Sequence, residues 1–254
     1  MLNTFLIVLP IVFLAGVVDS IAGGGGLLSV PAYMAAGLPP HSVLGTNKFS
    51  SSFGTFFATL RYHQHGLIDS RVALLSAFFA LGGSFLGART VLLIHPDFLR
   101  YLLIVLIPVI AAFTLFNRSL GQHDHSQLQA RGRKYSLAAV AATLIGFYDG
   151  FFGPGTGTFL ILFYTLVLKY DFVTANANTK VVNLASNIAA VTTFIVNSKV
   201  IYSIGIPAAV AGIAGNLLGA KLVIKRGSNI IRPIFILVLI LLLVKIVYDL
   251  LSAR

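Results

Sequence analysis

The sequence predicts an all-α polytopic membrane protein, with about eight hydrophobic helical segments in two homologous four-segment halves. Of the 254 residues, 57% are hydrophobic and only 10% are charged, and the mean hydropathy is +0.92. A soluble domain needs more charge than this to keep its surface in water. Uncharged apolar runs recur along the whole chain, and the two halves repeat a set of glycines and charges at matched positions.

Apolar runs of helical length account for the predicted number of segments. A helix needs about 20 residues to cross the hydrocarbon core of a bilayer. The runs cover residues 2–21, 49–60, 72–88, 101–117, 136–168, 181–197, 200–220 and 234–244. The first run has no basic n-region and no small-residue cleavage site, so we interpret it as a retained segment and not as a secretory signal.

Composition also excludes several classes of function. The absence of cysteine rules out disulfides, thiolate metal sites and cysteine nucleophiles. The net charge of +11 comes from basic residues scattered between hydrophobic segments, which indicates membrane topology and not nucleic-acid binding. The pairs His63/His65 and His123/His125 have no carboxylate or cysteine cluster to complete a metal site. HExxH, GxSxG and Walker motifs are absent, so we predict no enzyme, cofactor or metal.

An internal repeat divides the chain into a first transmembrane repeat at 1–117, a basic connecting loop at 118–134 and a second repeat at 135–254. A shift of 130 residues places Gly16, Asp19, Gly23 and Gly25 on Gly146, Asp149, Gly153 and Gly155, and a shift of 132 places Lys48, Gly83 and Gly87 on Lys180, Gly215 and Gly219. Transporters often bind substrate between such repeats, although duplication also builds channels and membrane enzymes.

The distribution of lysine and arginine favours one topology. Eight full spans would leave eight basic residues on one side of the membrane and seven on the other, which gives no orientation. If the first segment of each half is instead a hairpin broken at a glycine-rich tip, the balance becomes eleven against four and obeys the positive-inside rule. Three full spans then follow each hairpin, so we expect the halves to be inverted and both termini to lie outside.

Two glycine clusters, GVVDSIAGGGG at 16–26 and GFYDGFFGPGTG at 146–157, carry the strongest functional signal. Each glycine costs a helix about 1 kcal/mol relative to alanine, so these clusters should break the helices. Freed N–H groups before a helix that starts at Leu27 or Thr158 would form an anion-binding concavity, whereas close helix packing is the alternative use of the glycines. The candidate binding residues here are Gly23, Gly24, Gly25, Gly26, Gly153, Gly155, Thr156 and Gly157.

Charged and amide side chains extend this candidate site. Asp19 and Asp149 precede the glycines and would either couple transport to a proton or cation, or cap a broken helix or pair with a lysine. Lys48 and Lys180 follow polar runs at the entry to an apolar helix and would attract an anion. The remaining candidate binding residues are Asn47, Ser51, Asn178, Asn183 and Asn187, although such groups more often bond a neighbouring helix.

Five motifs together resemble the sulfite exporter family TauE/SafE, bacterial membrane proteins of the 4-toluene sulfonate uptake permease type. They are the two glycine clusters, LPPHSVLGTNK at 38–48, NTKVVNLASN at 178–187 and GNLLGAKL at 215–222. The resemblance implies a multi-pass protein of the bacterial inner membrane that carries sulfite, an organosulfonate or another sulfur-containing anion. It also implies a site at 23–26, Lys48, 153–157 and Lys180.

We therefore predict a secondary transporter, exporter or importer, in which two glycine-tipped hairpins meet near the midplane and bind a small anion, with alternating access between the repeats. An anion-selective channel and a transporter of a small carboxylate are the alternatives. The expected partners are the anion, the lipid bilayer and a coupling proton or cation, and not nucleic acid. Substrate identity, direction and homo-oligomer formation stay open.

Overall fold

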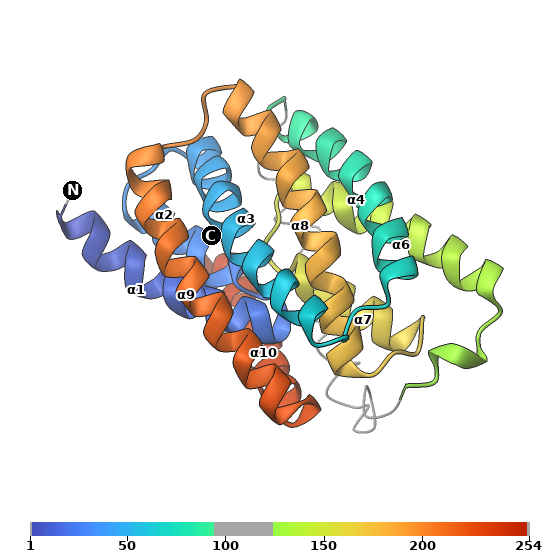
Figure 1. Ribbon diagram of the computed structural model, residues 1–254. Coiled ribbons are helices and arrows are strands. Elements are labelled where there is room, and N and C mark those ends of the chain that lie inside the picture. Colours follow the sequence, from blue (N-terminus) through green and yellow to red (C-terminus); the bar gives the residue numbers. More distant parts are fainter. Residues whose placement is uncertain (1, 94–123, 253–254) are drawn as a thin grey trace.

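The computed structural model describes residues 2–93 and 124–252, and helices dominate this part of the chain. This confirms the prediction of an all-α polytopic membrane protein. The predicted span at 101–117, His123 and the junction between the first repeat and the connecting loop lie outside the described residues. Figure 1 shows α3 and α8 at the centre, with α1, α2 and α9 to one side and α4 and α6 to the other.

Turn residues set the limits of the helices in the first half. These helices are α1 (Leu2–Ala22), α2 (Gly26–Ala35), α3 (Pro40–Gln64) and α4 (Ser70–Val91). Gly37 adopts a positive φ of 81° after α2, a conformation that favours glycine. Pro40 opens α3, where its missing N–H costs nothing. Asp69 caps α4 by accepting a hydrogen bond from the Val72 N–H.

The second half repeats this order. A short 3-10 helix, η1 (Ser126–Leu128), precedes α6 (Arg131–Phe151), α7 (Thr156–Leu166), α8 (Phe172–Val196), α9 (Tyr202–Arg226) and α10 (Ser228–Ser252). Asp171 caps α8 by accepting hydrogen bonds from the N–H groups of Val173 and Thr174 at 2.8 and 3.0 Å. Helix α6 already begins at Arg131, inside the predicted connecting loop.

Both predicted helix breaks are present, between α1 and α2 and between α6 and α7. The second helix of each pair starts earlier than expected, at Gly26 and Thr156 instead of Leu27 and Thr158. The polar runs before Lys48 and Lys180 were also placed wrongly at helix entries, because both lie inside long helices, α3 and α8. Their polar groups are tolerated there because they face other parts of the protein and not lipid.

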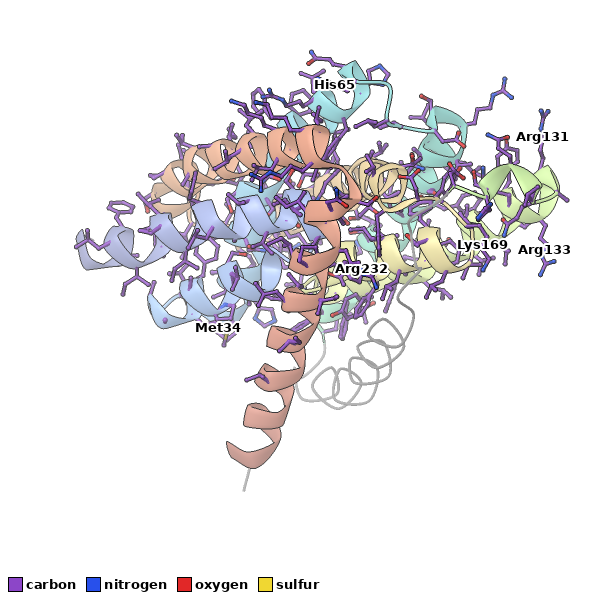
Figure 2. The ribbon with its side chains drawn as sticks, turned by 90° about the horizontal axis from the view of Figure 1, so that it is seen from below. Met34, His65, Arg131, Arg133, Lys169 and Arg232 are labelled. Atoms are coloured by element: carbon purple, nitrogen blue, oxygen red, sulfur yellow. The ribbon has the colours of Figure 1, made fainter. Side chains whose placement is uncertain are left out.

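The helix ends gather at two opposite ends of the bundle. At the first, here called the Leu38 end, Val8 of α1 clusters with Val30 of α2, Leu38 and Ala208 of α9. At the second, the Asp69 end, Lys134 of α6 lies 3.4 Å from Asp69, and residues of the α7–α8 turn and the α9–α10 turn lie close by. Figure 2 shows Arg131, Arg133 and Lys169 together at one edge of the molecule.

Each broken helix forms a hairpin that returns to the end from which it came. Helices α1 and α2 share the Leu38 end, as the Val8 and Val30 contacts show. Helices α6 and α7 share the Asp69 end, where the Gln129 side chain donates to the Val167 carbonyl. The two hairpins therefore enter the bundle from opposite ends.

Close backbone contacts between the halves occur in matched pairs. A Cβ added to Gly83 of α4 would collide with the Thr143 carbonyl of α6, and one added to Gly215 of α9 would collide with the Phe13 carbonyl of α1. Gly215 is the repeat partner of Gly83, and Thr143 is the repeat partner of Phe13. Small residues permit this approach, as is usual in membrane helix bundles.

The outer surface is apolar, as a bilayer requires. Large side chains such as Leu14, Phe78, Leu144 and Val210 are more than half exposed. Within the described ranges, four helices are long and apolar enough to cross a membrane, namely α1, α4, α8 and α9. Helix α3 is equally long but fails this test because polar side chains line its buried face.

Candidate functional site

The two helix breaks touch each other in the interior of the bundle. Gly23 has a positive φ of 76°, and Gly157 packs against it so closely that an added Cβ would lie 2.5 Å from the Gly23 Cα. A Cβ on Gly26 would lie 3.2 Å from the Cα of Pro154 in the other break. Only residues without side chains allow two backbones to meet in this way. The breaks of the two hairpins thus form one site.

A small polar pocket lies beside these breaks. Asp19, Gly23, Gly26, Asn47, Lys48, Ser51 and Thr55 line it from the first half, and Asp149, Gly153, Thr156, Gly157, Asn183 and Asn187 line it from the second. Each of these residues except Thr55 belongs to the site predicted from the sequence. The two halves therefore supply nearly equal shares of one pocket.

Helices α3 and α8 present matching polar rows to the pocket. Ser51 and Thr55 of α3 are the repeat partners of Asn183 and Asn187 of α8, and both pairs are four residues apart. Side chains with this spacing lie on the same face of a helix. Because Thr55 is the repeat partner of Asn187, the internal repeat could have identified Thr55 from the sequence. The amide oxygen Oδ1 of Asn183 is buried and has no hydrogen-bond partner among the described residues.

Two buried ion pairs cross between the halves at this pocket. Lys48 Nζ of α3 lies 2.7 Å from Asp149 Oδ2 of α6. Lys180 Nζ of α8 lies 2.8 Å from Asp19 Oδ2 of α1. Each half thus provides one lysine and one aspartate to the other half, and the two pairs are related by the repeat. Of the roles expected for the aspartates, pairing with a lysine is the one that the structure shows.

The Lys48–Asp149 pair is almost fully buried, although both residues border the pocket. Both side chains are 5% exposed. The Lys48 ammonium also donates to Asn187 Oδ1 at 3.0 Å, and the Ser186 hydroxyl donates to the Asp149 carboxylate. A buried ion pair needs such additional hydrogen bonds, because desolvation can otherwise exceed the attraction between the charges.

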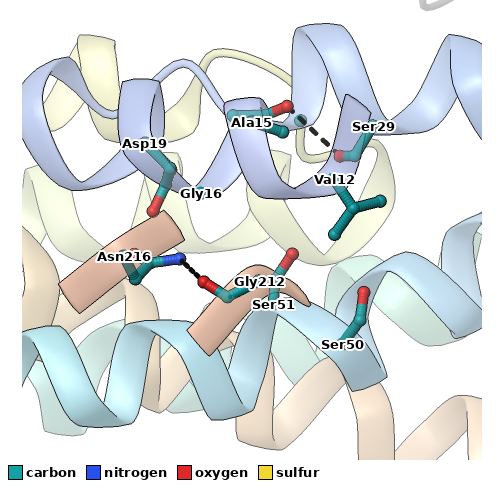
Figure 3. Close-up of a pocket in the computed structure, with 11 residues that line it drawn as sticks. Val12, Ala15, Gly16, Asp19, Ser29, Ser50, Ser51, Gly212 and Asn216 are labelled. Carbon is teal, nitrogen blue, oxygen red and sulfur yellow. Dashed lines mark hydrogen bonds between the residues drawn. The ribbon is translucent and has the colours of Figure 1, made fainter. Parts of the chain in front are cut away.

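The Lys180–Asp19 pair is partly exposed to solvent. Lys180 is fully buried and also donates to the backbone carbonyl of Asp19, but the Asp19 carboxylate is 19% exposed. Asp19 lines both the pocket between the breaks and a second pocket beside it, shown in Figure 3. The aspartate of this pair is therefore the one that water reaches.

The second pocket connects the site toward the Leu38 end. It shares Asp19, Gly26 and Ser51 with the first pocket, and it is also lined by Val12, Ala15, Gly16, Gly25, Ser29, Ser50, Gly212 and Asn216. Val12 belongs to the apolar cluster at the Leu38 end. Figure 3 shows Val12 and Asp19 at opposite sides of this pocket, with the Asn216 side chain donating to the Gly212 carbonyl within α9.

The breaks also leave backbone N–H groups without acceptors. In the described part of the chain, the N–H groups of Gly24, Gly25, Gly155 and Gly157 have no backbone partner. Gly25 and Gly157 line the two pockets. Such groups at a helix N-terminus favour bound anions.

Some predicted residues lie apart from the pocket between the breaks. Gly24 packs against Val238 of α10, and Gly155 caps α7 with a φ of 86°. Asn178 points to the Asp69 end, where its Oδ1 accepts from the Asp69 N–H at 2.9 Å. Lys180 reaches the pocket only through Asp19. Among the residues with described positions, no group of three or more potential metal ligands occurs.

Comparison with known proteins agrees with this architecture. The profile of the family described as "Sulfite exporter TauE/SafE" matches residues 8–246. "Probable membrane transporter protein YfcA" of Escherichia coli K12 is 36% identical over 241 residues, which cover 94% of this chain and 88% of that protein. "Probable membrane transporter protein ORF9" of a Sinorhizobium species is 34% identical, covering 93% and 90%. No solved structure matches significantly.

A third relative, a "Probable membrane transporter protein" of Haemophilus influenzae, is 33% identical over 237 residues and covers 93% of this chain. The family match and all three relatives extend over both halves, including both glycine breaks. The chain therefore belongs to the sulfite exporter TauE/SafE family and is a multi-pass membrane transporter.

Proposed function

We propose that this transporter carries a small oxyanion, sulfite or an organosulfonate, by alternating access between its two halves. The observation that carries the proposal is the polar pocket built jointly by two glycine breaks and two crossed ion pairs. Secondary transporters typically bind substrate where discontinuous helices of two repeats meet. The family description names sulfite, which makes it the first substrate to test.

The groups that line the pocket suit an oxyanion. Ser51 and Thr55 offer hydroxyl donors, Asn183 and Asn187 offer amide donors, and Lys48 offers an ammonium. The N–H of Gly157 adds a backbone donor. Hydrogen bonds from charged donors to oxyanions are about twice as strong as neutral ones. A carboxylate substrate would use the same donors and remains the alternative cargo.

Charge balance suggests a coupling ion. With both ion pairs intact, the two lysines and two aspartates cancel, so the pocket gains little from charge attraction to an anion. A proton on Asp19 would release the charge of Lys180 and make the pocket cationic. Asp19 suits this role better than Asp149, because it is more exposed and lines both pockets. We therefore propose that a proton accompanies the anion.

The second pocket supplies the route to the Leu38 end in this state. The repeat partners of its residues Val12, Ser50 and Asn216 are Ala142, Val182 and Ser84, which lie at the matching interface of α4, α6 and α8. There the Ser84 hydroxyl donates to the Ser186 carbonyl and joins α4 to α8. The proposed transport step opens this second interface toward the Asp69 end while the first one closes.

Basic residues suggest the orientation. The Asp69 end carries Arg61, Arg71, Arg131, Arg133, Lys134, Lys169, Lys225, Arg226 and Arg232, close to the ends of the helices that meet there. The Leu38 end carries Arg89 and Lys199. By the positive-inside rule, the Asp69 end is cytoplasmic and both termini are periplasmic in the bacterial inner membrane. A reporter fused to the C-terminus that is active in the cytoplasm would contradict this orientation.

Uptake into proteoliposomes tests the proposed function. Sulfite uptake by the wild type should saturate and should rise with an inward proton gradient. Asn183→Ala should lower uptake at least about tenfold, because it removes a hydrogen bond to the anion worth up to about 1.5–3 kcal/mol. Asn197→Ala, at the exposed end of the same helix α8, is the matched control and should keep uptake. Conductance that does not saturate would indicate the channel alternative, and equal uptake by both variants would refute the site.

A further inference from the structure

A second polar cavity lies at the Asp69 end, separate from the pocket between the breaks. It has a volume of about 280 Å³ and is lined by Asp69, Arg71, Ser126, Gln129, Arg131 and Lys134, among others. It shares no residue with the pocket between the breaks. Its lining joins the first turns of α4 and α6 to the 3-10 helix η1.

The charges in this cavity are not balanced. Arg71 and Arg131 have no ion-pair partner among the described residues. Lys134 lies 3.4 Å from Asp69, which is the one acidic residue of the lining. Among the lining residues, three positive charges therefore face one negative charge, and the Asp124 carboxylate lies just outside the lining, where it accepts from the Ser126 N–H at 2.7 Å. The positive ends of two helix dipoles, from α4 and α6, add to this excess.

Asp69 is already engaged and does not neutralise the arginines. It accepts hydrogen bonds from the Tyr170 hydroxyl, the Val72 N–H and Lys134. Partial burial acts to raise the pKa of Asp69, but these hydrogen bonds and the Lys134 charge together hold it below its usual value. Burial and the neighbouring Asp69 raise the pKa of Tyr170, which keeps its hydroxyl as a donor.

The lining of the cavity includes an unsatisfied buried group. Ser126 is 1% exposed, and its hydroxyl has no hydrogen-bond partner in the described part of the chain. The side-chain oxygen of Gln129 is also unpartnered. Leaving a buried polar group unsatisfied costs about 1–3 kcal/mol, so a ligand that bonds the hydroxyl would recover this energy.

We propose that this cavity binds a phosphate-class oxyanion through the Arg71 and Arg131 guanidinium groups and the Ser126 hydroxyl. Guanidinium groups bind phosphate oxygens in a bidentate manner. The oxyanion comes either from the headgroup of an anionic phospholipid or from free phosphate in solution. The neighbouring Leu128, which is 83% exposed, offers an apolar contact for a lipid chain. This inference is independent of the transported substrate.

Binding of defined probes to the purified full chain in detergent tests the proposal. The probes are phosphatidylglycerol, zwitterionic phosphatidylcholine and sodium phosphate. Native mass spectrometry measures binding of each probe, and the melting temperature measures the stabilisation that binding causes. The double variant Arg71→Gln/Arg131→Gln should bind the preferred probe at least about tenfold more weakly than the wild type. Arg133→Gln is the matched control, because it lies in the same turn of α6 but outside the cavity.

The outcomes separate the two sources of the oxyanion. Phosphatidylglycerol binding that is lost in the double variant and kept in the control supports the proposal with a lipid ligand. Sodium phosphate binding with the same pattern supports it with a soluble ligand. Equal affinity of the wild type and the double variant for each probe, or no binding of either anionic probe to the wild type, would overturn it.

Discussion

The two ion pairs at the centre of the molecule have the same chemistry but different surroundings. Lys48–Asp149 is 5% exposed on both sides and is held by Asn187 and Ser186. In Lys180–Asp19 the lysine is fully buried, whereas the aspartate is 19% exposed and faces two pockets. The repeat partner of Ser186 is Gly54, which has no hydroxyl to offer Asp19. Duplication therefore produced one enclosed pair and one accessible pair.

This difference indicates a division of roles. A buried ion pair with additional hydrogen bonds fixes two helices relative to each other, because breaking it leaves a buried charge. A carboxylate that water reaches can exchange a proton without disrupting its surroundings. We therefore propose that Lys48–Asp149 holds the halves together and that Asp19 exchanges a proton during transport.

Removing the lysine from each pair should have unequal effects on stability. Lys48→Met leaves Asp149 buried with only the Ser186 hydroxyl and should lower the free energy of unfolding by about 3–5 kcal/mol. Lys180→Met leaves Asp19 in contact with water, so its loss should be clearly smaller. Denaturant unfolding in detergent measures both. Equal losses of stability in the two variants would contradict the division of roles. The double variant Lys48→Met/Asp149→Asn, which leaves no unpaired charge, should recover most of the stability but not the transport.

Neutralising Asp19 should uncouple transport from protons. Asp19→Asn keeps the shape of the side chain but cannot exchange a proton, so stimulation of sulfite uptake by a pH gradient should fall at least about tenfold. Uptake into proteoliposomes at a fixed sulfite concentration, with and without the gradient, measures this. Unchanged stimulation in Asp19→Asn would exclude Asp19 as the coupling group.

Filling the contact between the breaks should destabilise the protein to a smaller extent. In Gly157→Ala the new methyl group would lie 2.5 Å from the Gly23 Cα, and backbone on both sides prevents relief, so we expect a loss of about 1–3 kcal/mol. Gly82→Ala is the matched control, because nothing lies within 4 Å of its Cβ position. It should stabilise helix α4 by about 0.5–1 kcal/mol. Equal effects of the two variants would show that the breaks do not pack as described.

The smallest effect is expected at the Asp69 end. The pKa of Asp69 is held below its usual 3.8, so its ionised form stabilises the fold above that pH, and the contribution is lost as the pH falls through the lowered value. Asp69→Asn should therefore lower the free energy of unfolding at pH 7 by less than about 1 kcal/mol. The melting temperature should fall slightly as a result. The gap to the wild type should shrink as the pH falls below 3.8 and Asp69 becomes protonated. A gap that persists in acid would contradict this linkage.

Sequence reasoning found the helix breaks because local chemistry determines them. Four successive glycines cannot sustain a helix interior, and the repeat of this feature pointed to the second break. The same repeat identified Asp19, Asp149, Lys48 and Lys180 as a related set. Most of the pocket lining followed from these two observations.

The partners of these charges could not be predicted, because pairing depends on tertiary structure. Nothing in the sequence shows that Lys48 reaches Asp149 of the other half instead of Asp19 of its own. Asn178 shares the motif of Lys180 but faces another direction along α8, where it bonds the backbone at Asp69. Polar runs inside α3 and α8 looked like helix entries because their burial in a polar interior was not visible.

The central claim is that the pocket between the breaks binds a small oxyanion by means of its charged and amide groups. Calorimetric titration of the purified protein with sulfite, with sulfate and acetate as comparisons, tests it most directly. The account predicts saturable sulfite binding to the wild type and to Asn197→Ala, and at least about tenfold weaker binding to Asn183→Ala and to Lys48→Met/Asp149→Asn. Equal sulfite affinity in all four proteins would contradict it.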